Sequence, residues 1–93
     1  MIRMSVFYPA GDGTTFDHDY YKTKHVPMCT KAWNVKAEID KGSSGPYAAA
    51  VHFFFDSPEK LQAAMSGADI GAIMADIPNY TNTQPVIQIS EVA

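Results

Sequence analysis

The chain has 93 residues, of which 46% are hydrophobic and only 18% are charged, a composition that excludes an intrinsically disordered protein. The formal net charge is −3 and no basic cluster occurs, so the electrostatic footprint of a nucleic-acid-binding protein is missing. The single cysteine cannot form an internal disulfide, and no stretch reaches the roughly 18 apolar residues that cross a bilayer. We therefore expect one cytoplasmic domain over residues 1–93, with no membrane or nucleic-acid partner.

The N-terminal third predicts a strand followed by an irregular helix. Residues 2–8 form a compact apolar run, which is typical of a strand. Asp17 fits the role of an N-cap for a helix that runs toward Trp33. Pro27 falls inside this helix, where its ring clashes with the carbonyl four residues back. We therefore expect a kink or a break near His25.

The rest of the chain carries period-2 patterns and one strong helix start. Apolar and polar residues alternate over 35–41, whereas the next run is almost entirely apolar, as in a strand buried on both faces. Ser57 precedes Pro58, which is a capping residue followed by proline at the first helical position. In chain order we expect a strand at 35–41, a central strand at 47–55, a helix from Pro58 to about Ser66, a short helical piece around 70–75 and a last strand at 85–92.

The element order is β-α-β-β-α-β, which right-handed crossovers fold into a four-stranded antiparallel sheet with helices on one face. This α+β arrangement is ferredoxin-like. In the central strand Ala50, His52 and Phe54 alternate with Val51 and Phe53, and only one of the two sets can meet the helices. The other set leaves an apolar face uncovered. We expect a homodimer in which a second copy covers that face with its own sheet.

Tyr21 and His25 are the leading candidates for chemistry. They are four residues apart on the first helix, so they share a face. An unperturbed imidazole has a pKa of about 6.5 and exchanges protons at neutral pH, while a phenol can donate to a substrate oxygen. Tyr20 points about 100° away, so both tyrosines cannot face one cavity in a regular helix. The alternative is that the pair only packs the helix onto the sheet.

The other histidines and the cysteine carry weaker signals. His52 stands in the most apolar strand and either contacts a ligand or is a core histidine bonded to a neighbouring element. His18 lies two turns from His25, so these two cannot share a metal ion, and no metal site is expected. Cys29 is interpreted as a small buried hydrophobe. Haem binding through His25 or His52 stays open, because one imidazole suffices as an axial ligand.

Three segments together carry a resemblance to a known family. They are the run from Phe16 to Met28 with its tyrosine pair and His-x-Pro, the helix start from Phe55 to Glu59, and the tail over 76–81 and 85–90. They resemble the EthD family, over essentially the whole chain. The resemblance implies a dimeric α+β barrel with a pocket between sheet and helices in each subunit. EthD-like proteins are often described as oxidoreductases, and barrel relatives include monooxygenases, lactone isomerases, polyketide cyclases and haem-handling proteins.

Our leading hypothesis is a homodimeric enzyme that needs no cofactor and acts on a small hydrophobic, oxygenated molecule by proton transfer. His25 moves the proton and Tyr21 polarises or orients an oxygen. The alternatives are an oxidoreductase or monooxygenase-type accessory protein, and a non-catalytic dimer that binds a ligand or haem. The side chains expected to shape the substrate pocket are Tyr8, Tyr20, Trp33, His52, Phe53 and Phe54.

Overall fold

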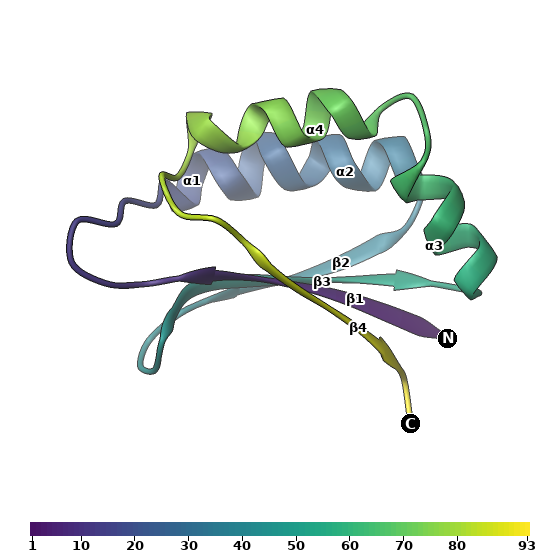
Figure 1. The fold of residues 1–93 in the computed structure, drawn as a ribbon, viewed down its shortest axis with the longest axis horizontal. Helices are drawn as coiled ribbons and strands as arrows, with labels where there is room; N and C mark the ends of the chain where they lie inside the picture. Colours follow the sequence, from purple (N-terminus) through teal and green to yellow (C-terminus); the bar gives the residue numbers. More distant parts are fainter.

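Four strands form one antiparallel sheet, and the helices cover one of its two faces (Figure 1). A computed structural model describes residues 1–93. The strand order β2-β3-β1-β4 places the first and third strands in the centre, which confirms the predicted ferredoxin-like topology. The strands are β1 (Ile2–Pro9), β2 (Lys36–Lys41), β3 (Tyr47–Phe55) and β4 (Val86–Glu91).

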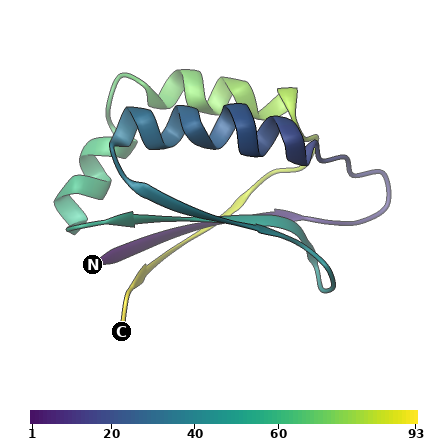
Figure 2. The ribbon, with the colours of Figure 1, turned by 180° about the vertical axis from the view of Figure 1, so that it is seen from behind.

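The helical layer is seen from its other side in Figure 2, with the sheet again lying wholly to one side of it. None of the helices has the length and apolar character needed to span a lipid bilayer. The helical elements are α1 (His18–Tyr20), a π-helical segment (Tyr21–His25), α2 (Val26–Trp33), α3 (Pro58–Met65), α4 (Ile70–Asp76) and a 3-10 turn (Ile77–Asn79).

The irregularity that Pro27 predicts takes the form of the π-helical segment. The amide of Val26 donates to the carbonyl of Tyr21, five residues back, which is the π-helical pattern. Pro27 follows in the first turn of α2 and has no N–H to donate to the preceding turn, and the wider π-helical turn accommodates the proline without a break in the helix. The chain therefore continues as one helical rod from α1 through α2, and His25 stands at the end of its π-helical turn.

The helix starts follow the predicted capping residues. The Asp17 carboxylate accepts from the amide of Tyr20 at 3.0 Å, and the Ser57 hydroxyl accepts from the amide of Lys60 at 3.3 Å. Each bond satisfies an amide that has no partner inside its helix. At the other end of α2, Asn34 adopts a left-handed conformation with φ of 53° and turns the chain into β2.

The two faces of the sheet differ in their cover. Met4 pairs with Phe53 and Val6 with Val51, and these residues are buried against the helices. On the opposite face Ser5 pairs with His52. Edge strand β4 is apolar but poorly covered. Its most exposed apolar side chains are Val86, Ile87 and Ile89, at 47%, 52% and 52%.

Candidate functional site

The first helical rod and the end of α4 bring His25 and Asp76 together. His25 Nδ1 lies 2.9 Å from Asp76 Oδ2, and the two residues are only 4% and 8% exposed. The π-helical turn sets the direction of the imidazole, and the last residue of α4 supplies the carboxylate. A buried carboxylate bonded to one imidazole nitrogen orients the ring and selects its tautomer.

Asp76 also accepts two further hydrogen bonds. The Tyr20 hydroxyl donates to Oδ1 at 2.7 Å, and the Asn79 amide donates to the same oxygen at 2.9 Å. Burial by itself raises the pKa of Asp76, but the bonds from Tyr20, Asn79 and His25 outweigh it and leave that pKa below its usual value. At neutral pH the carboxylate is therefore ionised and only accepts hydrogen bonds.

The protonation state of His25 follows from this partner. Burial lowers the pKa of His25, and the attraction of Asp76 only partly offsets the effect. The ring is thus neutral at pH 7, with its proton on Nδ1 facing the carboxylate. Nε2 then carries a lone pair and has no hydrogen-bond partner in the chain. This is the arrangement of a general base.

His25 borders an apolar cavity of about 60 Å³ between the sheet and the helices. Two residues at its edge, Met74 and Ile87, are about half exposed, at 53% and 52%. The side chains that line the cavity are mostly apolar, with polar atoms only at the ends of a few of them. The lining residues that bear on chemistry or shape are Tyr8, Tyr21, His25, Trp33 and Phe53. A mostly apolar cavity with a few polar groups is typical of a small-molecule site.

Two buried donors of this cavity have no partner. The Tyr21 hydroxyl and the Trp33 indole nitrogen are both fully enclosed and make no hydrogen bond of good geometry, although the Tyr8 hydroxyl lies near enough to that of Tyr21 to affect its pKa. Leaving such a group unpaired costs about 1–3 kcal/mol, and such groups are rare in folded proteins. Together with Nε2 of His25, they provide an acceptor and two donors that a ligand can satisfy.

Tyr21 stacks on His25 without bonding to it. The ring centroids are 5.7 Å apart and the planes differ by 14°. Burial, followed by the neighbouring Tyr8, raises the pKa of the Tyr21 hydroxyl, so it remains a protonated donor. Tyr80 adds a third aromatic ring, with its centroid 4.5 Å from that of His25 and its hydroxyl 2.8 Å from that of Tyr8.

No protein-family model and no curated protein matches the sequence, but solved structures do. An EthD-like protein from Ralstonia eutropha JMP134 is 37% identical, with a TM-score of 0.88, and the match covers 99% of this chain and 91% of that one. The chain belongs to the EthD family.

More distant structures share the fold of this EthD chain. An EthD family protein from Bacillus halodurans C-125 is 17% identical with a TM-score of 0.78, over 100% of this chain and 99% of that one. A dimeric ferredoxin-like protein from Thermobifida fusca YX is 19% identical with a TM-score of 0.65, over 98% and 90% of the two chains. At these identities the likeness shows the fold alone.

The EthD fold divides the side chains expected at the pocket into three groups. Tyr8, Trp33 and Phe53 line the cavity beside His25 and Tyr21. Tyr20 does not line the cavity, and its hydroxyl instead donates a hydrogen bond to Asp76. His52 and Phe54 are on the opposite face of the sheet and do not line the cavity beside His25.

On the opposite face His52 forms a polar row across three strands. Its Nδ1 is 2.7 Å from the Ser5 hydroxyl and its Nε2 is 3.0 Å from Asp40 Oδ2. The guanidinium of Arg3 lies 5.5 Å from the ring centroid of Phe54. Both nitrogens of His52 are thus engaged within the EthD chain.

The geometry bears on metal and haem ligation by the histidines and the cysteine. No cluster of three or more His, Cys, Asp or Glu side chains has the proximity needed to hold a metal ion. A haem macrocycle does not fit the cavity of about 60 Å³ beside His25, and both nitrogens of His52 are engaged. Burial raises the pKa of the Cys29 thiol to about 12, so it is not a thiolate at neutral pH.

Sequence reasoning missed Asp76, Asn79 and Tyr80. Asp76 and Asn79 are three residues apart at a helix end, which places them near each other, but no local pattern connects them with His25. A search of the sequence for a carboxylate that could orient His25 would have included Asp76, but only as one of several candidates.

Proposed function

We propose that this EthD-family chain is a homodimeric enzyme that moves a proton of a small hydrophobic, oxygenated molecule without a cofactor. One observation carries the proposal. His25 is held through Nδ1 by a buried, ionised carboxylate at 2.9 Å, its Nε2 makes no hydrogen bond within the chain, and the residue lines an apolar cavity.

The reaction step uses the residues of this cavity. His25 Nε2 takes a proton from a carbon next to a carbonyl, and the electron pair of the broken C–H bond moves to the carbonyl oxygen. The Tyr21 hydroxyl, which has no partner in the chain, donates a hydrogen bond to the resulting enolate. Asp76 stabilises the imidazolium. The same imidazolium then returns the proton, to the same carbon or to another, so no oxidant or reductant is consumed.

The uncovered surface supports the homodimer. Phe7 lies on the sheet face that carries no helix, where it neighbours the exposed side chains of Tyr47 and Val86, whereas the exposed Ile87 and Ile89 lie at the edge of the other face. Single exposed apolar residues are ordinary, but a contiguous patch indicates an interface. A second copy related by two-fold symmetry covers the same patch on both subunits.

Proton transfer at carbon is measured by hydrogen–deuterium exchange. We would follow by NMR the loss of the α-proton signals of 2-butanone and of 2,4-pentanedione in D₂O, under anaerobic conditions and without added reductant. The wild-type chain is expected to accelerate exchange, and His25→Ala is expected to lose about 10²- to 10⁴-fold of that acceleration. The matched control is His18→Gln, which changes a histidine outside the cavity.

Three outcomes would reject the proposal. If exchange is equally fast with His25→Ala, His25 is not the base. If a ligand binds but no exchange occurs, the result favours the non-catalytic ligand-binding dimer. Turnover that appears only when O₂ is admitted favours the oxidoreductase or monooxygenase hypothesis instead.

A further inference from the structure

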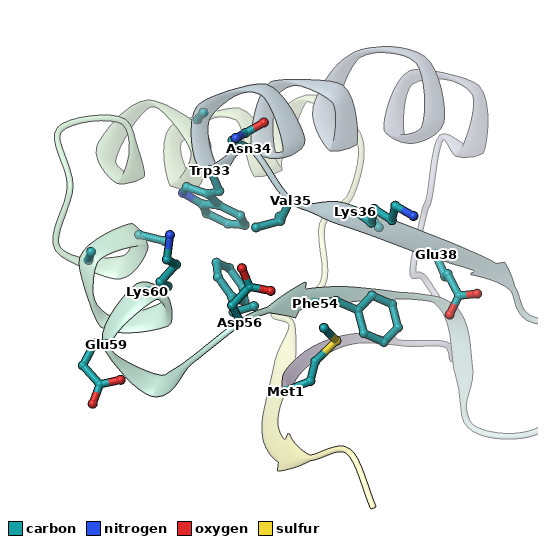
Figure 3. Close-up of a pocket in the computed structure, with 15 residues that line it drawn as sticks. Met1, Trp33, Asn34, Val35, Lys36, Glu38, Phe54, Asp56, Glu59 and Lys60 are labelled. Carbon is teal, nitrogen blue, oxygen red and sulfur yellow. The ribbon is translucent and has the colours of Figure 1, made fainter.

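A second, wider depression lies beside the cavity. This groove has a volume of about 1270 Å³ and is open to solvent. It runs between the junction of α2 with β2, the end of β3, and α3, and Figure 3 shows Trp33, Val35 and Phe54 around it. Its walls include Trp33, Val35, Phe54, Phe55, Ala63 and Ala64.

Trp33 belongs to both the groove and the cavity. Its ring meets Phe53, which lines the cavity, edge-on with centroids 5.1 Å apart. The same ring lies 6.0 Å from the ring of Phe55, which lines the groove. The indole of Trp33 is therefore the wall between the two spaces, and its N–H is one of the unpaired buried donors.

The size of the cavity limits what it can hold by itself. At about 60 Å³ it accommodates the equivalent of about two water molecules, since each occupies roughly 30 Å³ in the liquid. A carbonyl with its α-carbon fits, but a longer molecule must extend out of the cavity. The groove behind Trp33 provides the apolar surface for that extension.

The charges of the groove indicate a neutral ligand. Two basic residues, Lys36 and Lys60, line the groove together with the acidic residues Glu38, Asp56 and Glu59. The positive and negative charges along the groove therefore nearly balance. A site for an anionic tail would show an excess of basic groups. The apolar walls are left as the main source of affinity.

We propose that the ligand is a neutral, elongated molecule with a small carbonyl head beside His25 and an apolar tail that lies in the groove past Trp33. This inference rests on the proposed function, because the head occupies the cavity of the proposed base. The ring of Trp33 turns to join the two spaces when such a molecule binds.

A homologous series of methyl ketones tests the tail. We would titrate 2-butanone through 2-octanone and read binding from the fluorescence of Trp33, which is the only tryptophan in the chain. Burying one methylene improves affinity by about fourfold, so affinity is expected to rise roughly two- to fourfold for each added methylene. The fluorescence change is expected to grow along the series.

Two variants on α3 test whether the ligand tail lies in the groove or leaves the cavity by another path. Ala63 is exposed and lines the groove, whereas its neighbour Gln62 is exposed and does not. With Ala63→Phe the increase in binding affinity for each added methylene is expected to become smaller. With Gln62→Phe this increase is expected to match that of the wild-type chain. Each variant is compared with its own 2-butanone value, and circular dichroism checks that both fold.

The outcomes distinguish this inference from the proposed function. A flattened gain with Ala63→Phe, together with exchange that depends on His25, supports both. The same flattened gain without His25-dependent exchange supports the groove and rejects the proposed chemistry. Equal gains in both variants mean that the tail leaves elsewhere, such as past Met74 and Ile87, and overturn the inference. An affinity that does not depend on chain length also overturns it.

Discussion

His25 and Asp76 are 51 residues apart in the sequence, yet His25 Nδ1 lies 2.9 Å from Asp76 Oδ2 in a buried contact. The contact fixes the proton of the neutral ring on Nδ1 and leaves Nε2 as the nitrogen that carries the free lone pair. The first prediction follows from this pair. In Asp76→Asn the imidazole loses the acceptor that selects its tautomer, and α-proton exchange is expected to fall about 10²-fold or more.

The tautomer itself can be observed. Nitrogen-15 NMR of the imidazole is expected to show the proton on Nδ1 in the wild-type chain and a mixed population in Asp76→Asn. Asp69→Asn is the control, because Asp69 is exposed at the start of α4 and caps it with no side-chain bond. An unchanged tautomer in Asp76→Asn would contradict the role given to the carboxylate.

The second prediction concerns pH. The pKa of His25 in the folded chain lies below the ordinary 6.5, so the unfolded chain takes up this proton first as the pH falls. Stability from this group is complete above about pH 6.5 and declines as the pH falls through the folded pKa. Exchange activity should decline over the same range, since a protonated imidazole is no base.

Protonation of Asp76 also lowers the stability of the folded chain as the pH falls, but at a lower pH than protonation of His25. Its folded pKa lies below the ordinary 3.8, so its stabilising effect is lost as the pH falls below that value. Urea unfolding of the wild-type chain and of His25→Gln, at pH values between 7.5 and 4.5, checks the histidine contribution. Parallel curves for the two proteins over this range would refute it.

The third prediction compares two buried tyrosines. Tyr21→Phe removes a hydroxyl that has no partner, so the free energy of unfolding is expected to stay constant or rise, while exchange slows about 10- to 100-fold. Tyr8→Phe breaks the 2.8 Å bond to Tyr80 and is expected to lower the free energy of unfolding by about 1–3 kcal/mol. Chemical denaturation together with the exchange assay measures both. Equal destabilisation by the two substitutions would show that the Tyr21 hydroxyl has a structural partner.

The fourth prediction concerns assembly. Sedimentation velocity is expected to give a dimer at micromolar concentration. Phe7→Glu places a charge on the sheet face without helices, where the ring of Phe7 packs at a tilt against that of Tyr47 with centroids 5.1 Å apart, and is expected to give a folded monomer. Ala68→Glu adds the same charge at an exposed site between α3 and α4 and should leave the dimer intact. A monomeric wild-type chain would rule out the homodimer.

Several features could be predicted because they depend on neighbours in the sequence. The capping bonds of Asp17 and Ser57 span three residues, and the apolar periods depend on spacing alone, so the elements start and end within about a residue of their predicted bounds. The shared face of Tyr21 and His25 is local in the same way. Pro27 predicted an irregular turn for a steric reason that also requires no distant residue.

The tertiary structure decided everything that depends on which distant surfaces meet. Alternation divides β3 into two sets but does not say which set faces the helices, and the packed layers placed Phe53 inside with His25 while Phe54 and His52 went to the other face. Likewise Tyr20 and Tyr21 are adjacent in sequence, but one bonds Asp76 and the other lines the cavity. The sequence alone thus determined the elements and the Tyr21–His25 pair, because short-range sterics and hydrogen bonds set them. The contact of the Asp76 carboxylate with His25, and the cavity that His25 lines, arise only when elements about fifty residues apart pack together.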